Sequence, residues 1–240
     1  MPGFRKTIKK WLVDSYDCLG LVLLSSLAWF GLAAGGLTLI FSNKWTCSPA
    51  LLFGVFAFIY VFMISPLITG IFLMAKKIVI HDEPSLLDLI NGFKEFLVSS
   101  WTLGFAQLLV TLVIVVNAWY YLTRGSPAVK LVGIVFVYAF VLWAMSALYH
   151  YPILVEQRSG VLKILKRGVL LAMDNFAFTA GVLFVIILLA CLCSVTVIGL
   201  ALLYMGMASI LLTRALRALF VKYELLPPER EPEKSATETA

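Results

Sequence analysis

The chain has 240 residues, of which 62% are hydrophobic and only 13% are charged, and its mean hydropathy is +0.99. A soluble domain of this length needs a far more polar surface, so the composition indicates an integral membrane protein. The basic balance, a net charge of +6, could suggest nucleic-acid binding, but no basic patch with interleaved aromatic residues lies outside the apolar runs, which argues against that function.

The apolar runs predict an all-α, polytopic membrane protein with six transmembrane helices. A basic, amphipathic N-terminus (1–17) precedes a charge-free run, Cys18 to Phe41, which is expected to be a retained anchor rather than a signal peptide. The next three spans are predicted at about 48–74, 101–122 and 131–155.

A long charge-free run from Phe176 to Thr213 is too long for one span and predicts two helices with a turn near 193–197. The six-helix domain therefore covers residues 18–225. The last residues, 226–240, are rich in Pro, Glu, Ser and Thr and are expected to form a disordered cytoplasmic tail.

The distribution of positive charge predicts the orientation. With six spans, all of the 19 Lys and Arg residues except Lys44, Arg124 and Lys130 fall on one side of the membrane. Lys and Arg are retained on the cytoplasmic side, so both termini are expected inside the cell. With five spans the positive charges would be divided almost evenly, which favours six.

Two amphipathic helices are predicted in the cytoplasmic loops, at 85–97 and 160–171. Ser85 and Asp88 have the spacing of a capping box at the start of the first helix. The basic residues of the two loops are candidate contacts to anionic lipid headgroups or to a partner protein: Lys94, Arg158, Lys163, Lys166 and Arg167. Either role, an interfacial helix that caps the bundle or a docking surface, is compatible with the pattern.

The two amphipathic helices also align with each other. Pairing Gly92 with Gly168 superimposes leucines on leucines and Ser99 on Asn175. Each unit enters from an even-numbered span and leaves by an odd-numbered one, which is typical of a parallel repeat.

A Ser-Pro pair inside span two (Ser65, Pro66), the segment Glu83-Pro84-Ser85-Leu86-Leu87-Asp88-Leu89-Ile90-Asn91-Gly92-Phe93, and the later Asp174-Asn175 pair together resemble the YesL-like family of uncharacterised bacterial integral membrane proteins. The resemblance covers about residues 3 to 225. It implies a bacterial inner-membrane location and a link to carbohydrate uptake beside ABC-transporter components. It supplies no catalytic residues.

Four polar side chains fall inside the predicted spans: Gln107, Asn117, Ser146 and His150. His150 lies between Tyr149 and Tyr151, where either a hydrogen-bonded place in an aromatic belt or a relay or substrate role is conceivable. The other three either line a cavity or bind neighbouring helices through hydrogen bonds.

Small residues and prolines mark further features of the spans. Gly31 and Gly35 lie on a small-residue face suited to helix packing, within the chain or in a homo-oligomer. Pro66 and Pro152 are expected to kink their helices. Cys47 approaches the outer side together with the Cys191 and Cys193 pair, so a disulfide is conceivable, whereas a zinc site is not supported.

No nucleotide-binding loop, nucleophile elbow or zinc-protease motif is present, and no cofactor or metal is predicted. The sequence therefore favours a non-enzymatic membrane protein accessory to a carbohydrate transport system of the ABC type. The alternative is an autonomous channel or transporter for a small neutral solute. An enzyme acting on lipid would need more than one titratable residue in a shared cavity.

Overall fold

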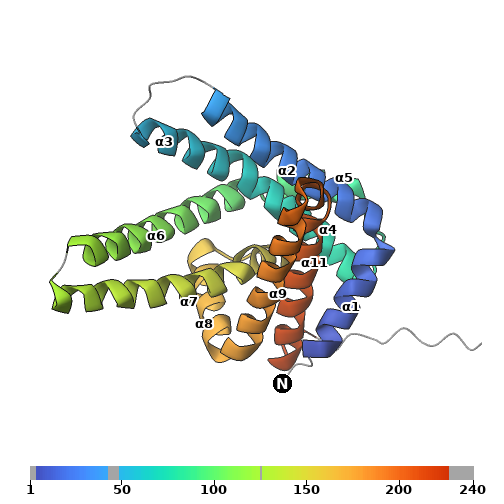
Figure 1. Cartoon of the computed structure of the whole chain (residues 1–240). Coiled ribbons are helices and arrows are strands. Elements are labelled where there is room, and N and C mark those ends of the chain that lie inside the picture. The colour runs from blue at the N-terminus through green and yellow to red at the C-terminus, as the bar shows by residue number, and fades with distance from the viewer. Residues whose placement is uncertain (1–3, 43–48, 125, 227–240) are drawn as a thin grey trace, which may run out of the picture.

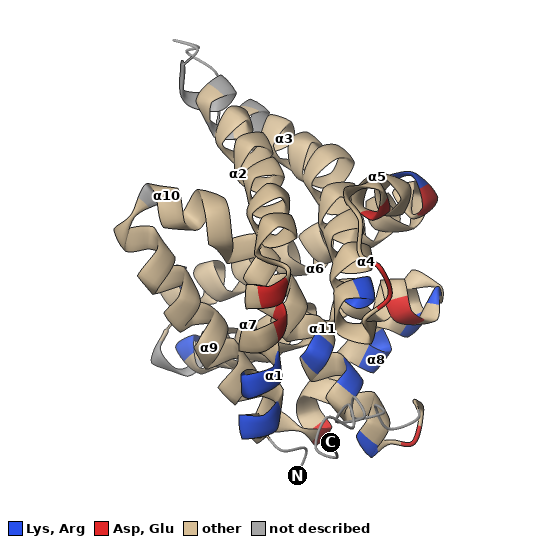
Figure 2. Ribbon diagram, turned by 90° about the vertical axis from the view of Figure 1, so that its right-hand side faces the viewer, with Lys and Arg blue, Asp and Glu red and all other residues tan. Residues whose placement is uncertain are grey.

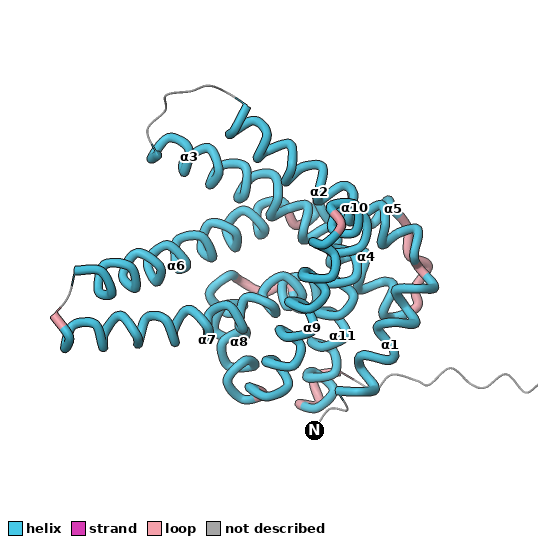
Figure 3. Tube along the Cα trace, in the orientation of Figure 1, coloured by secondary structure: helices cyan, strands magenta, loops and turns pink. Residues whose placement is uncertain are grey.

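The computed structural model describes residues 4–42, 49–124 and 126–226, and within them every regular element is helical (Figures 1 and 3). The elements in chain order are α1 (Phe4–Asp17), α2 (Leu19–Ser42), α3 (Pro49–Ile59), the π-helix η1 (Tyr60–Ile64), α4 (Ser65–Ile80), α5 (Leu86–Glu95), α6 (Leu97–Arg124), α7 (Pro127–Gln157), α8 (Val161–Asp174), α9 (Phe176–Val195), α10 (Val197–Gly199), the π-helix η2 (Leu200–Tyr204) and α11 (Met205–Lys222).

Six helical stretches of the described chain are long and apolar enough to cross a membrane: Leu19–Gly36, Leu52–Ile80, Leu97–Arg124, Val129–Gln157, Phe176–Val195 and Leu200–Lys222. The prediction of an all-α, multi-pass membrane protein is thereby confirmed. The turn between the last two spans lies at Thr196, within the predicted interval.

The predicted end of span two, residue 74, is too early, because α4 continues through two lysines to Ile80. Lys76 and Lys77 extend the helix because each finds a carboxylate partner on another element, as described below. Two lysines therefore lie within this helix without ending it.

Both predicted amphipathic helices are present as α5 and α8, which begin near the expected residues. The Ser85 hydroxyl accepts a hydrogen bond from the Leu87 N–H at 3.3 Å, while the Asp88 carboxylate accepts one from the Ser85 N–H at 2.9 Å. This reciprocal capping fixes the start of α5. α8 runs to Asp174, three residues beyond the predicted end.

A three-unit repeat organises the chain, where the sequence alignment indicated two units. Each unit is an amphipathic helix, an odd-numbered span and an even-numbered span: α1–α2–α4, α5–α6–α7 and α8–α9–α11. Each amphipathic helix ends with an acid, and one residue then separates it from the span. These pairs are Asp17-Cys18, Glu95-Phe96 and Asp174-Asn175.

The repeat alignment inferred from the sequence needs one correction. It paired Ser99 with Asn175, whereas the residue that breaks the helices in the second unit is Phe96. The offset arises because α8 has 14 residues and α5 has 10. The glycine pairing itself has a structural counterpart, since Gly92 packs on α4 and Gly168 packs on α7.

The even-numbered spans converge at the centre. α4, α7 and α11 contact one another, and α5, α8 and α1 pack against them in that order. Fully buried apolar side chains from all three fill this centre, including Ile71, Ala75, Leu154, Ala215 and Leu219. Most of the described charged residues gather around it on α1, α5, α8 and the ends of the three spans (Figure 2), and we refer to this as the charged end.

Away from the charged end, the helices separate into hairpins. In Figure 1 the α2–α3 pair and the α6–α7 pair diverge from the shared centre. Side chains on the outer parts of α6 and α7, such as Trp119 and Tyr138, are exposed. Such surfaces are stable where hydrocarbon rather than water surrounds them.

One of the two prolines at which the sequence predicts a kink, Pro66, directly follows the first residue of α4 and a π-helical turn, whereas the second π-helical turn, η2, was not predicted. Pro66 lacks an N–H, so the carbonyl of Phe62 loses its helical partner. The Trp101 indole N–H donates to this carbonyl at 3.2 Å, and the preceding turn is the π-helix η1. α7 continues through Pro152 as one uninterrupted helix.

Candidate functional site

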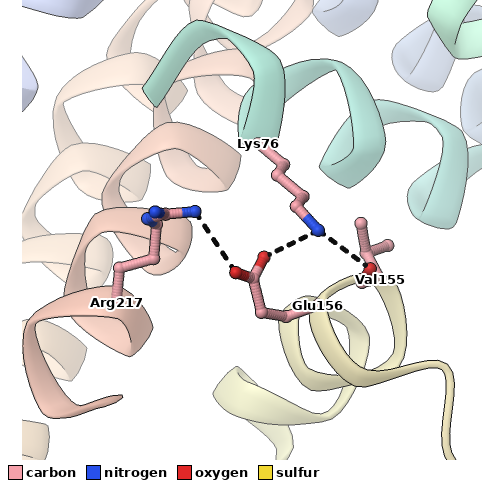
Figure 4. A network of polar contacts seen from close by, with 4 residues as sticks. All are labelled: Lys76, Val155, Glu156 and Arg217. Carbon is pink, nitrogen blue, oxygen red and sulfur yellow. Dashed lines mark hydrogen bonds and ion pairs between the residues drawn. The ribbon is translucent and has the colours of Figure 1, made fainter. Parts of the chain in front are cut away.

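One carboxylate joins the three central helices at the charged end. Glu156 of α7 accepts from the Lys76 ammonium of α4 at 3.0 Å and from the Arg217 guanidinium of α11 at 3.2 Å (Figure 4). Lys76 also donates to the Val155 carbonyl at 3.5 Å. The Glu156 side chain is only 9% exposed, so its charge is stabilised by these cations rather than by water.

A second buried ion pair adjoins this junction. Arg214 of α11 and Asp14 of α1 are 5% and 4% exposed and are directly paired. Trp11 reinforces the same contact by donating its indole N–H to the Met207 carbonyl at 2.8 Å. These contacts hold the N-terminal amphipathic helix α1 against the last span, α11, although the two helices lie at opposite ends of the sequence.

Two further ion pairs hold α5. Lys77 of α4 pairs with Asp88 at 2.9 Å, and Arg158 at the end of α7 pairs with Glu95 at 2.6 Å. The Arg158 guanidinium also lies over the Phe96 ring, 5.4 Å from its centroid. The charged end is therefore cross-linked by ion pairs that begin on every central helix.

A buried polar cluster lies deeper in the bundle, around His150. The Gln107 amide nitrogen is 2.8 Å from the His150 Nδ1, and the Tyr60 hydroxyl donates to the Gln107 amide oxygen at 3.4 Å. An amide NH2 group only donates, so Nδ1 accepts and the ring proton resides on Nε2, which faces the Ser146 hydroxyl at 3.5 Å. The cluster thus joins η1, α6 and α7.

Another hydroxyl group, on Ser65, links α4 to α6 and α7. The Tyr151 hydroxyl donates to Ser65 at 3.0 Å, and Ser65 donates to the Ser100 carbonyl at 2.6 Å. Thr69 and Ser100 share a hydrogen bond of 2.7 Å between their hydroxyls. Each of these polar groups is therefore satisfied inside the protein, as burial in an apolar bundle requires.

Three of the four predicted intramembrane polar residues come together and one does not. Gln107, Ser146 and His150 are buried in the cluster. Asn117 is only half-buried, and it donates to the Val113 carbonyl of its own helix at 2.7 Å. The four residues therefore do not share one cavity.

The structure also places the glycines predicted to pack helices and the cysteines considered for a disulfide. A Cβ atom at Gly31 or Gly35 would meet no atom within 4 Å, so neither glycine makes a close helix contact within the described chain. Cys191 and Cys193 are free thiols, and Cys47 lies outside the described residues. Burial, followed by the charges of Asp17 and Asp14, raises the pKa of the Cys18 thiol.

The predicted contact residues of the cytoplasmic loops divide into two kinds. Lys94, Lys163 and Lys166 are exposed. Arg158 is engaged by Glu95, and Arg167 donates to the Gln157 side chain. The exposed lysines therefore remain the better placed of the five for contacts to headgroups or to another protein.

This arrangement can hold helices and charges in place, but it does not resemble a nucleophilic centre. The Ser146 hydroxyl donates to the Trp143 carbonyl at 2.9 Å rather than to His150. Within the described residues no carboxylate orients the His150 ring, and no group of three or more His, Cys, Asp or Glu side chains is suited to a metal ion. A Ser-His-acid arrangement would need both features to be different.

The sequence did not predict the ion-paired junction at Glu156. Lys76, Glu156 and Arg217 lie in three separate segments, and nothing in their spacing connects them. A usable signal was present, however: each is a charged residue among the last six residues of an even-numbered span.

Comparison with known proteins returns no match, whether against protein-family models, curated proteins or solved structures. The resemblance to the YesL-like family therefore stays a prediction.

We expect Glu156→Gln to lower the free energy of unfolding by about 3 kcal/mol, because it leaves two cations side by side without a carboxylate. Thermal or denaturant unfolding of the purified protein in detergent measures the loss. Glu95→Gln is the matched control: its pair with Arg158 is 42% and 66% exposed, so the cost should stay below about 1 kcal/mol. Equal losses for the two variants would contradict the central role of Glu156.

Gln107→Leu should lower the free energy of unfolding by about 1–2 kcal/mol, because it leaves the Tyr60 hydroxyl and the His150 ring without their partner. Asn117→Leu provides the control, since among the described residues the Asn117 amide donates to the Val113 carbonyl of its own helix rather than to another helix. We expect no loss of stability from the Asn117 change in the same unfolding assay. A comparable loss would show that Asn117 has a buried partner.

Proposed function

We propose that this chain is a non-enzymatic membrane protein that acts through its charged end, as an accessory of a carbohydrate transport system of the ABC type. The observation that carries the proposal is the outer face of α5. Its inner side, with Asp88 and Gly92, is buried, whereas Leu86, Leu87 and Ile90 are exposed beside Lys94. Leu87 is 65% exposed.

The position of α5 also favours a docking role. Gly70 and Gly92 bring α4 and α5 so close that a Cβ on Gly70 would lie 2.4 Å from the Leu89 carbonyl oxygen. The ion pairs of Asp88 and Glu95 hold the helix near its start and at its end. A helix fixed in this way presents its exposed side chains without the entropic cost of ordering a mobile segment.

The alternative, an autonomous channel or transporter for a small neutral solute, has less support. Such a protein needs polar groups along a continuous path, but Gln107, Ser146 and His150 are buried and hydrogen-bonded within the protein. Asn117 is half-buried and binds the Val113 carbonyl of its own helix instead of this cluster. Interaction at the charged end therefore accounts for more of the described polar residues than transport through the bundle does.

The proposal places the charged end in the cytoplasm of a bacterial cell, with the chain in the inner membrane. The support is the excess of Lys and Arg at this end, which follows the positive-inside rule. Reporter fusions at residues 127 and 240 test the orientation: we expect residue 127 outside and residue 240 inside. A reporter at residue 240 that is active outside the cell would refute it.

Chemical cross-linking and co-purification from native membranes test the partner. We expect the wild-type chain to recover subunits of a sugar transporter, and Leu87→Glu to reduce this recovery by about tenfold, since a buried charge at an apolar contact costs more than about 1.4 kcal/mol.

Leu12→Glu is the matched control, because Leu12 is a similarly exposed leucine (51%) on the amphipathic helix α1. Its recovery should equal that of the wild type. If the wild-type chain brings down no transporter subunit, or if the two variants lose equally, the proposed docking face is wrong.

A further inference from the structure

A cavity of about 320 Å³ opens at the charged end where α1, the start of α9 and the end of α11 meet. The residues that shape it are Phe4, Asp174, Asn175, Phe178, Gly181 and Lys222. Phe176 begins one candidate membrane span and Lys222 ends another. The cavity therefore lies where the hydrocarbon region gives way to the headgroups.

The inner wall of the cavity is aromatic. Phe4 and Phe178 meet edge to face, with ring centroids 6.0 Å apart. Gly181 leaves room for this contact, since a Cβ atom there would lie 3.0 Å from the Phe4 ring. Phe176 lines the cavity as well and is 54% exposed.

The polar groups of the cavity carry opposite charges. The Lys222 ammonium donates to the Asn175 amide oxygen at 2.5 Å, and Asn175, which is 7% exposed, donates to the Tyr223 hydroxyl at 2.9 Å. Asp174 adds a carboxylate at the exposed rim. One cation and one anion therefore border an apolar recess.

In the second unit of the repeat, the position that corresponds to this cavity is closed by an ion pair. There the cation at the end of the even-numbered span, Arg158, pairs with the acid before the break, Glu95, and covers the Phe96 ring. In the third unit the corresponding cation, Lys222, binds the amide of Asn175 instead of the acid Asp174. The two charges thus stay separate in the unit that contains the cavity.

We propose that this cavity binds the headgroup of a zwitterionic aminophospholipid, with the phosphate at Lys222, the ammonium at Asp174 and the glycerol end against Phe176 and Phe178. The proposal is independent of any transport partner. A volume of about 320 Å³ lies at the lower end of ligand-pocket sizes and suits a headgroup rather than a whole lipid. An anionic headgroup would pair with Lys222 but would be repelled by Asp174.

Native mass spectrometry of the full chain, released from detergent, tests the proposal with phosphatidylethanolamine, phosphatidylglycerol and phosphatidylcholine of identical acyl chains. We expect the wild-type protein to retain phosphatidylethanolamine most strongly. Lys222→Gln should weaken its binding about tenfold, which corresponds to the loss of one charge-assisted hydrogen bond. Asp174→Asn should weaken phosphatidylethanolamine and strengthen phosphatidylglycerol.

Lys130→Gln is the control, because Lys130 is exposed near the start of α7, outside the charged end, and does not line the cavity. Lys222→Arg keeps the charge and should keep binding, and the unfolding temperature of each variant shows that it folds. Equal retention of all three lipids, or an unchanged preference in Asp174→Asn, would overturn the proposal. So would equally tight binding of glycerophosphoethanolamine, which lacks acyl chains, since the site would then recognise a free phosphate ester.

Discussion

The fold depends on the shared neutralisation of charge where α4, α7 and α11 converge. Glu156 is nearly buried and binds a cation from each of the other two helices, so none of the three can leave the centre without exposing a charge to an apolar surrounding. The Arg214–Asp14 pair attaches α1 to the same centre. Lys77 and Asp88 attach α5 to it. The amphipathic helices are thus held by the ends of the spans rather than by the lipid surface alone.

Close approach of the helices is what brings these charges within reach. Gly70 and Gly92 remove the side chains that would separate α4 from α5, and Gly168 does the same where α8 crosses the His150 ring. The π-helical turns require compensation elsewhere: the Trp101 indole binds the Phe62 carbonyl, and the Ser26 hydroxyl accepts from the Gly206 N–H at 2.8 Å. In a bundle surrounded by hydrocarbon, each freed backbone group needs such a partner, since water does not supply one.

The three units of the repeat share the same order of elements but differ in the contacts that their charged residues make. An acid and a one-residue break follow each amphipathic helix, but Arg158 pairs with the acid of the second unit while Lys222 binds the amide of the third. This single difference separates a closed, ion-paired corner from one that retains a cavity. Likewise, Gln107 and Asn117 occupy the same span, but only Gln107 faces His150 across the bundle. The chemistry of each position therefore depends on its neighbours in space more than on its type.

The sequence by itself determined the class, the six spans, the amphipathic helices α5 and α8 and the cap at Ser85, because length, hydropathy and capping act over short stretches of chain. It also indicated that Gln107, Ser146 and His150 were notable. The tertiary structure alone decided that these three meet while Asn117 does not, and that Gly31 and Gly35 lie in open space. It alone joined Glu156 to Lys76, 80 residues earlier in the chain, and to Arg217, 61 residues later, and separations of this size carry no local signal. Such contacts depend on how each helix is rotated and tilted against its neighbours, and packing across the bundle sets that rotation.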